Sequence, residues 1–197
     1  RPGRRHGFLF SITDKRFPVL QGDGQNRLAD LILRHPRYRL QAETFFQRHH
    51  ARLDSVPARG QAVLLAAAGN HCQGTLFLNG RRLAGRGLRQ ALDELADRMP
   101  GFHLGRFDIR YRDAAALRKG RGFQIVELNL GGAEATHVYD PSLSLHSAWR
   151  ALCLQWSLLF ERGAYERARG AAVLSVRSFL RDARAYAAAA GQRGGTD

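Results

Sequence analysis

Two short segments in the middle of the chain alternate between polar and apolar residues, and they constrain the fold more than any other feature. Residues 105–110 read Gly-Arg-Phe-Asp-Ile-Arg, and residues 125–132 read Ile-Val-Glu-Leu-Asn-Leu-Gly-Gly. In an extended chain successive side chains point to opposite faces, so each segment predicts a β-strand with one polar and one apolar face. Because the connection between them is short, we expect the two strands to pair antiparallel.

Antiparallel pairing would bring the polar residues of the two strands together. Asp108 would then lie near Glu127 and Asn129, with the guanidinium of Arg106 beside them. Carboxylate and amide oxygens are hard ligands that suit Mg²⁺. The same residues could instead line the solvated face of an ordinary two-stranded ribbon, and spacing alone does not separate these interpretations.

The order of these residues also carries a family resemblance. Arg-x-Asp, a short connection and Glu-x-Asn before a glycine-containing turn resemble the metal-binding end of the ATP-grasp carboxylate–amine ligases. This group includes D-alanine–D-alanine ligase, cyanophycin synthetase and glutathione synthetase. Residues 19–32, a Gly-Asp-Gly turn before a short helix with leucines and an isoleucine, resemble a segment of the cyanophycin-synthetase-like and glutathione-ligase-like members.

The resemblance implies an α+β fold in which an antiparallel sheet packs with helices. Residues 1–165 would form the C-terminal, metal- and phosphate-binding part of an ATP-grasp domain, and residues 166–197 a C-terminal helix and tail. The chain begins with Arg1 rather than Met. In these enzymes much of the adenine-binding lobe lies upstream, so we expect a catalytic fragment that lacks the N-terminal lobe, and the sequence leaves open whether it turns over by itself.

The activity implied by the resemblance is an ATP-dependent carboxylate–amine or carboxylate–thiol ligase that works through an acyl-phosphate. ATP and Mg²⁺ would be the cofactors, and a small-molecule carboxylate and amine the substrates. The resemblance assigns the metal to Asp108, Glu127 and Asn129. It assigns stabilisation of the transferring phosphoryl group to Arg106.

Six further residues complete the candidate site. The resemblance implies contacts of Asn70 and His71 with the nucleotide phosphates and of Gly131, Gly132 and Glu134 with the substrate. Lys15 is a further candidate for a phosphate contact because of its charge. A solvated lysine at a strand end, a surface histidine and a glycine-rich turn would produce the same sequence features.

The strongly basic composition supports a rival interpretation. The formal net charge is +14, and of the 31 basic residues only Lys15 and Lys119 are lysines. Such a chain could be an arginine-driven nucleic-acid-binding module, which would show clustered arginine on one surface and binding that weakens steeply with salt. High-GC coding bias would also enrich arginine. No nucleic-acid motif is present, so we expect no specific nucleic acid as a partner. A third possibility is a catalytically inactive ATP-grasp domain that serves in protein interaction.

The remaining composition is that of an ordinary globular protein. The longest apolar run, residues 62–69, is far shorter than the roughly 20 residues that a membrane-spanning helix needs. Two cysteines are too few for a disulfide framework. We therefore expect no membrane span and a cytoplasmic location.

Hydrophobic periodicity predicts the other elements. Residues 7–13 alternate as a strand, residues 62–66 and 75–78 fit a hairpin, and residues 88–99 fit a helix with one apolar face. Residues 145–160 repeat apolar side chains at three and four, which predicts a helix whose aromatic stripe packs into the core. A second helix is expected from about residue 165 to 190.

Overall fold

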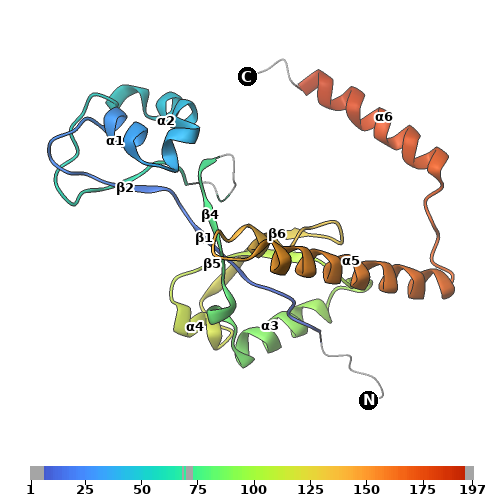
Figure 1. Cartoon of the computed structure of the whole chain (residues 1–197). Coiled ribbons are helices and arrows are strands. Elements are labelled where there is room, and N and C mark those ends of the chain that lie inside the picture. The colour runs from blue at the N-terminus through green and yellow to red at the C-terminus, as the bar shows by residue number, and fades with distance from the viewer. Residues whose placement is uncertain (1–6, 68, 70–72, 194–197) are drawn as a thin grey trace. The chain divides into compact units, whose positions relative to one another are not determined.

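The computed structural model describes residues 7–67, 69 and 73–193 and has an α+β architecture (Figure 1). The chain divides into two compact units, Arg1–Gln155 and Trp156–Asp197. This division falls inside helix α5 (Leu145–Ala168), whereas the sequence places a boundary between residues 165 and 166. Among the described residues, the strands form three antiparallel sheets of two strands each.

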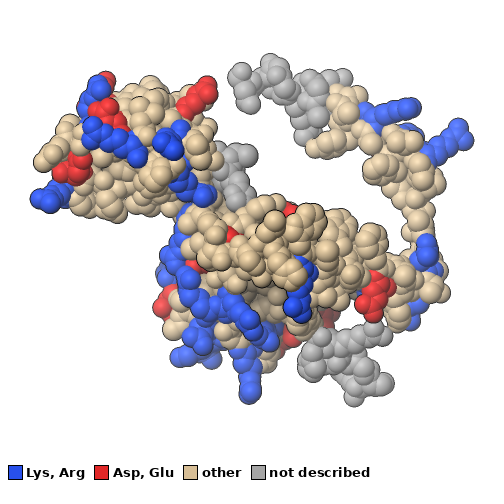
Figure 2. Space-filling view, in the orientation of Figure 1, with Lys and Arg blue, Asp and Glu red and all other residues tan. Residues whose placement is uncertain are grey.

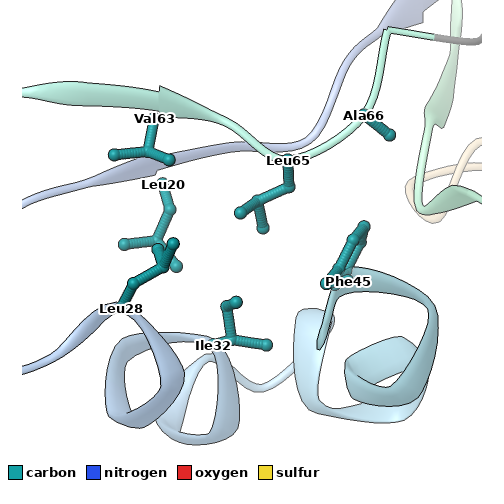
Figure 3. Packing of buried hydrophobic residues seen from close by; sticks show 7 residues of the cluster. All are labelled: Leu20, Leu28, Ile32, Phe45, Val63, Leu65 and Ala66. Carbon is teal, nitrogen blue, oxygen red and sulfur yellow. The ribbon is translucent and has the colours of Figure 1, made fainter. Parts of the chain in front are cut away.

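One hydrophobic core lies between the sheet of β2 (Val19–Gln21) with β3 (Ala62–Leu64) and helices α1 (Leu28–Arg34) and α2 (Ala42–His49). Figure 3 shows the side chains that fill it: Leu20, Leu28, Ile32, Phe45, Val63, Leu65 and Ala66. Two short 3₁₀ helices, η1 (Tyr38–Gln41) and η2 (His50–Arg52), flank α2.

Two further sheets lie in the same unit. Strand β1 (Thr13–Arg16) pairs with β4 (Leu76–Asn79), and β5 (Arg106–Tyr111) pairs with β6 (Phe123–Asn129). A second core, made of Leu83, Leu88 and Leu117, joins η4 (Arg81–Leu83), α3 (Arg86–Ala96) and α4 (Ala114–Arg118). The predicted hairpin of residues 62–66 with 75–78 is wrong, because β3 pairs with β2 and β4 with β1.

The strand predicted at residues 7–13 begins later than its pattern suggested. Phe8 is largely exposed, and pairing with β4 starts only at Thr13. Alternating apolar residues favour an extended chain, but a strand also needs a partner for its backbone groups. Among the described residues, only residues 13–16 pair with β4.

The aromatic stripe predicted to lie in the core is instead exposed. On α5, Leu145 is 74% exposed and Phe160 is 70% exposed, and Trp149 and Trp156 are also exposed. The second helix predicted from about residue 165 does not begin there. Instead α5 runs on to Ala168 and ends at a Schellman motif in which Gly170 adopts a φ of 93°. Helix α6 then spans Val176–Arg193. Of the helices in the described part of the chain, none is long and apolar enough to cross a membrane.

Candidate metal and phosphate site

The register of β5 and β6 brings the polar residues of the two strands onto one face. Asp108 pairs with Glu127, and Arg106 pairs with Asn129. Residues directly opposite each other in an antiparallel pair point to the same side of the sheet, so all four side chains share that side. The predicted antiparallel pairing is therefore confirmed, and Asp108 and Glu127 lie directly opposite each other on the same face.

A register shift ends this polar arrangement. It falls between Asp108 and Ile109, so that Ile109 pairs with Ile125 while Val126 is left without a partner across the ribbon. A bulge of this kind bends the strand and changes the direction of its side chains. The candidate site is thus confined to the end of the ribbon that holds Arg106 and Asn129.

Two cations bind the carboxylate of Asp108. Arg106 Nε donates to Oδ1 at 2.8 Å, and Lys15 Nζ donates to Oδ2 at 2.8 Å. Lys15 comes from β1, 93 residues earlier in the chain. Sequence reasoning proposed Lys15 as a phosphate contact but did not associate it with Asp108, because no local pattern connects the two residues.

The same contacts set the protonation state of Asp108. Burial opposes ionisation, but the hydrogen bonds from Lys15 and Arg106 and their positive charges outweigh it, and the pKa of the carboxyl lies below its ordinary value. Asp108 is therefore a carboxylate at neutral pH, which is the form needed to bind a metal ion.

Neighbouring residues constrain the position of the Lys15 side chain. Lys15 pairs with Phe77 across the β1–β4 ribbon, and its ammonium lies 5.6 Å from the centre of the Phe77 ring. A Cβ atom added to Gly69 would lie 3.1 Å from Lys15 Cδ, so the backbone approaches the lysine closely at that point. The aromatic face and this backbone segment hold the lysine stem beside Asp108.

The other two candidate metal ligands, Glu127 and Asn129, have side-chain atoms without a partner among the described residues. Glu127 is exposed, and its carboxylate forms no hydrogen bond or ion pair with the part of the chain that the structure describes. Asn129 is half-buried, and its Nδ2 atom has no hydrogen-bond partner there either. A buried amide nitrogen without a partner costs about 1–3 kcal/mol. Rotation of the amide would place Oδ1 at the same point, where a ligand could satisfy either atom.

These residues fit Mg²⁺ by the chemistry of their donors. Asp108, Glu127 and Asn129 supply two carboxylates and an amide oxygen on one face, which is a hard-oxygen set. Within the described residues no group of three or more His, Cys, Asp or Glu side chains could hold a metal, so such a site would depend on Asn129. Both oxygens of Asp108 already accept a hydrogen bond, and a metal ion would have to share them with Lys15 and Arg106.

The loop after β6 closes over the same end of the ribbon. Arg106 Nη1 donates to the backbone oxygen of Glu134 at 3.2 Å, while the Glu134 carboxylate accepts a hydrogen bond from the hydroxyl of Tyr139. Of the two glycines in this loop, Gly132 has open space where a Cβ would lie. The loop therefore lies beside the catalytic candidate Arg106, although the Glu134 carboxylate itself points to Tyr139.

A buried glutamine that sequence reasoning missed fixes this loop. Gln155 of α5 is 8% exposed. Its Oε1 accepts from the backbone nitrogen of Ala135 at 2.9 Å, and its Nε2 donates to the backbone oxygen of Ala133 at 2.7 Å. One side chain thus satisfies two backbone groups of the loop. The only signal in the sequence was a polar residue next to the apolar stripe of α5.

Two of the candidates, Asn70 and His71, lie outside the described residues, and the backbone of Gly69 before them passes close to Lys15. The described part of the site holds two cations and three oxygen donors from β1, β5 and β6, a combination that can bind phosphate oxygens and a divalent cation together. No protein-family model and no curated protein sequence matches this chain.

Proposed function

We propose that this chain carries the metal- and phosphate-binding part of an ATP-dependent carboxylate–amine or carboxylate–thiol ligase of the ATP-grasp type. The observation that carries the proposal is the register of β5 and β6, in which Asp108 faces Glu127 and Arg106 faces Asn129. The same four residues carry the sequence resemblance to this group of ligases. Lys15, from a distant strand, adds a second cation to the cluster.

The reaction that this proposal implies has two steps. A substrate carboxylate oxygen attacks the γ-phosphorus of ATP, and ADP leaves with the electrons of the broken phosphoanhydride bond. An amine or thiol then attacks the acyl carbon, phosphate leaves, and the attacking group loses its proton. Asp108, Glu127 and Asn129 would hold Mg²⁺, which would supply positive charge that offsets the charge of the phosphate groups.

The contacts of Arg106 suit a role at the transferring phosphoryl group. Its Nε is bound to Asp108 and its Nη1 to the backbone of Glu134, while Nη2 has no partner among the described residues. Hydrogen bonds through Nε and Nη1 thus fix the orientation of the guanidinium, and Nη2 remains available to donate to a phosphate oxygen. A donor fixed before the reaction stabilises developing charge, and removing one such donor commonly costs about 3–4 kcal/mol in activation free energy.

Lys15 has the same character as a second donor. One of its three N–H bonds is directed to Asp108, and the ammonium can turn its other protons toward a phosphate oxygen.

ATP and Mg²⁺ are supplied in the cytoplasm, and we place the reaction there. A carboxylate and an amine of low molecular weight are the proposed substrates.

The test begins with nucleotide binding by the 197-residue chain, measured by titration calorimetry with ATP in the presence and absence of Mg²⁺. We expect Mg²⁺-dependent binding that falls at least tenfold in Asp108→Asn and in Glu127→Gln. Glu161→Gln, which removes an exposed carboxylate from α5, is the matched control and should bind as the wild type does. Binding that is independent of Mg²⁺, or equal in all four proteins, would reject the metal assignment.

Ligase chemistry is tested separately, by incubating the chain with ATP, Mg²⁺, the common amino acids as carboxylate donors and hydroxylamine as the amine. An acyl-phosphate captured by hydroxylamine gives a hydroxamate, which is detected as its coloured ferric complex, together with ADP. Nucleotide binding without ADP or hydroxamate from any donor would reject ligase activity of the isolated 197-residue chain.

A further inference from the structure

Six exposed cations belong to the surface of η4, the first turn of α3 and the end of α4 with the turn that follows it, three segments that pack around Leu83, Leu88 and Leu117. We call this surface the arginine face, and its members are Arg81, Arg86, Arg89, Arg118, Lys119 and Arg121, all of them exposed. Figure 2 shows Lys and Arg side chains gathered over this region, in contrast to the predominantly uncharged surface of α5.

Close backbone packing brings the two segments of the arginine face together. A Cβ atom added to Gly85 would lie 2.1 Å from the backbone oxygen of Arg118, and one added to Gly87 would lie 2.4 Å from that of Lys119. The start of α3 therefore touches the end of α4 directly. Cations that are some 30 residues apart in sequence become neighbours on one surface.

The cations of the arginine face have no acidic partners in the part of the chain that the structure describes. Within the described residues none of the six takes part in an ion pair, whereas neighbouring Arg82 pairs with Asp14, and Arg27 pairs with Asp30 and Asp54. Like charges that are close together and unpaired repel one another, and an anionic ligand relieves that repulsion. Coding bias would add arginines throughout the chain, but it does not account for a surface whose cations form no ion pair with any described acidic residue.

The composition of the surface indicates which kind of anion would bind. Of the large hydrophobic side chains found exposed in the described structure, none lies between residues 65 and 124. Protein interfaces depend on apolar and aromatic anchors at their centre, and membrane-surface helices need an apolar face to insert. A nucleic-acid backbone needs neither, since phosphates are bound by Arg and Lys through charge and paired hydrogen bonds.

We propose that the arginine face binds the phosphate backbone of nucleic acid without reading its sequence. Such binding is separate from the proposed ligase site, since it uses other residues and needs neither ATP nor Mg²⁺. It is compatible with the absence of a sequence-reading motif, because backbone contacts fix position but carry no sequence information.

The experiment measures fluorescence anisotropy of a labelled 20-base-pair DNA duplex of mixed sequence, titrated with the full chain at several KCl concentrations between 50 and 200 mM. We expect dissociation constants on the order of 10⁻⁶ M at low salt, rising steeply with KCl. The variant Arg86→Gln/Arg89→Gln/Arg118→Gln should bind at least tenfold more weakly at 100 mM KCl. Its salt dependence should also be shallower, by about 0.9 in the log–log slope for each phosphate that the variant no longer neutralises.

The matched control removes three exposed arginines from elsewhere in the same unit: Arg39→Gln/Arg48→Gln/Arg59→Gln. It makes the same change in net charge and should lose less than threefold in affinity. Should the first variant fail to fold by circular dichroism, the other half of the face, Arg81→Gln/Lys119→Gln/Arg121→Gln, provides the same comparison.

Three results would overturn the proposal. The first is no duplex binding at 50 mM KCl. The second is an equal loss in the two triple variants, which would mean that diffuse charge rather than the arginine face binds DNA. The third is tighter binding to polyglutamate of matched charge, or to phosphatidylserine-containing vesicles, than to the duplex, which would assign the face to an acidic protein or a membrane surface.

Discussion

The ion pair between Lys15 and Asp108 offers the sharpest test of how the candidate site is built, because it joins β1 to β5 across 93 residues of sequence. The two atoms are 2.8 Å apart, and the side chains are 28% and 18% exposed. Fully exposed pairs contribute about 0.2–1 kcal/mol, and hydrogen bonds to charged groups about 1.5–3 kcal/mol. For this half-buried pair we expect a coupling free energy of about 1–2 kcal/mol.

A double-mutant cycle measures that coupling. Lys15→Met should lower the free energy of unfolding by about 1–2 kcal/mol, and Asp108→Asn by about 2–3 kcal/mol because it weakens the bond to Arg106 as well. The double variant should lose about 1–2 kcal/mol less than the sum of the two. Urea unfolding at pH 7 and 25 °C, followed by far-ultraviolet circular dichroism, gives the four values.

The second lysine of the chain provides the control. Lys119 is exposed and outside any ion pair of the described residues, so Lys119→Met should change stability by less than about 0.5 kcal/mol. Strict additivity of Lys15→Met and Asp108→Asn at pH 7 would mean that the pair does not stabilise the fold. That result would refute the proposal that the ion pair between Lys15 and Asp108 holds the candidate site together.

The pH dependence of the coupling follows from the direction of the pKa shift. The pKa of Asp108 is lower in the folded chain than its ordinary value of 3.8. Its stabilising contribution is therefore fully present above the unfolded-state pKa and is lost as pH falls through the folded-state pKa. The coupling measured at pH 7 should persist at pH 5 and decline only in more acidic solution.

Two other predictions concern stability. The pKa of His35 is lowered by burial and by the charge of Arg37, so its neutral ring contributes stability that is complete above the ordinary value of 6.5 and is lost as pH falls below it. The urea midpoints at pH 8 and pH 5 should therefore differ less in His35→Gln than in the wild type. An equal difference in the two proteins would contradict this prediction. Gly85→Ala would force a methyl group against the Arg118 backbone and should cost about 1–3 kcal/mol, whereas Gly163→Ala on α5, where a Cβ meets open space, should stabilise by up to about 1 kcal/mol. Thermal unfolding of both glycine variants checks the sign.

Local sequence patterns correctly predicted the strands and helices whose formation depends mainly on the residues within them. The alternation around Arg106 and Glu127 predicted two strands that pair antiparallel, and the apolar spacing of residues 88–99 predicted helix α3. Predictions failed where the partner of a segment mattered. Residues 62–66 and 75–78 read as a hairpin because they are close in sequence, yet each pairs with an earlier strand.

Burial was the other property that local periodicity could not predict. The repeat at three and four along α5 shows that its apolar side chains share a face, but whether another element covers that face is decided elsewhere in the chain. In the structure Trp149 and Phe160 are exposed, while polar Gln155 is buried because it satisfies the loop after β6. The helix prediction from residue 165 failed for a local reason, since a glycine in the left-handed region ends α5.

The sequence by itself determined which residues of the ribbon share a face, because the side-chain period of an extended chain is fixed by backbone geometry. The tertiary structure decided which cation meets Asp108, how the loop after β6 is anchored, and that the arginines of α3 and α4 form one surface. Contacts between residues tens of positions apart depend on how whole elements pack, and no local pattern records that packing.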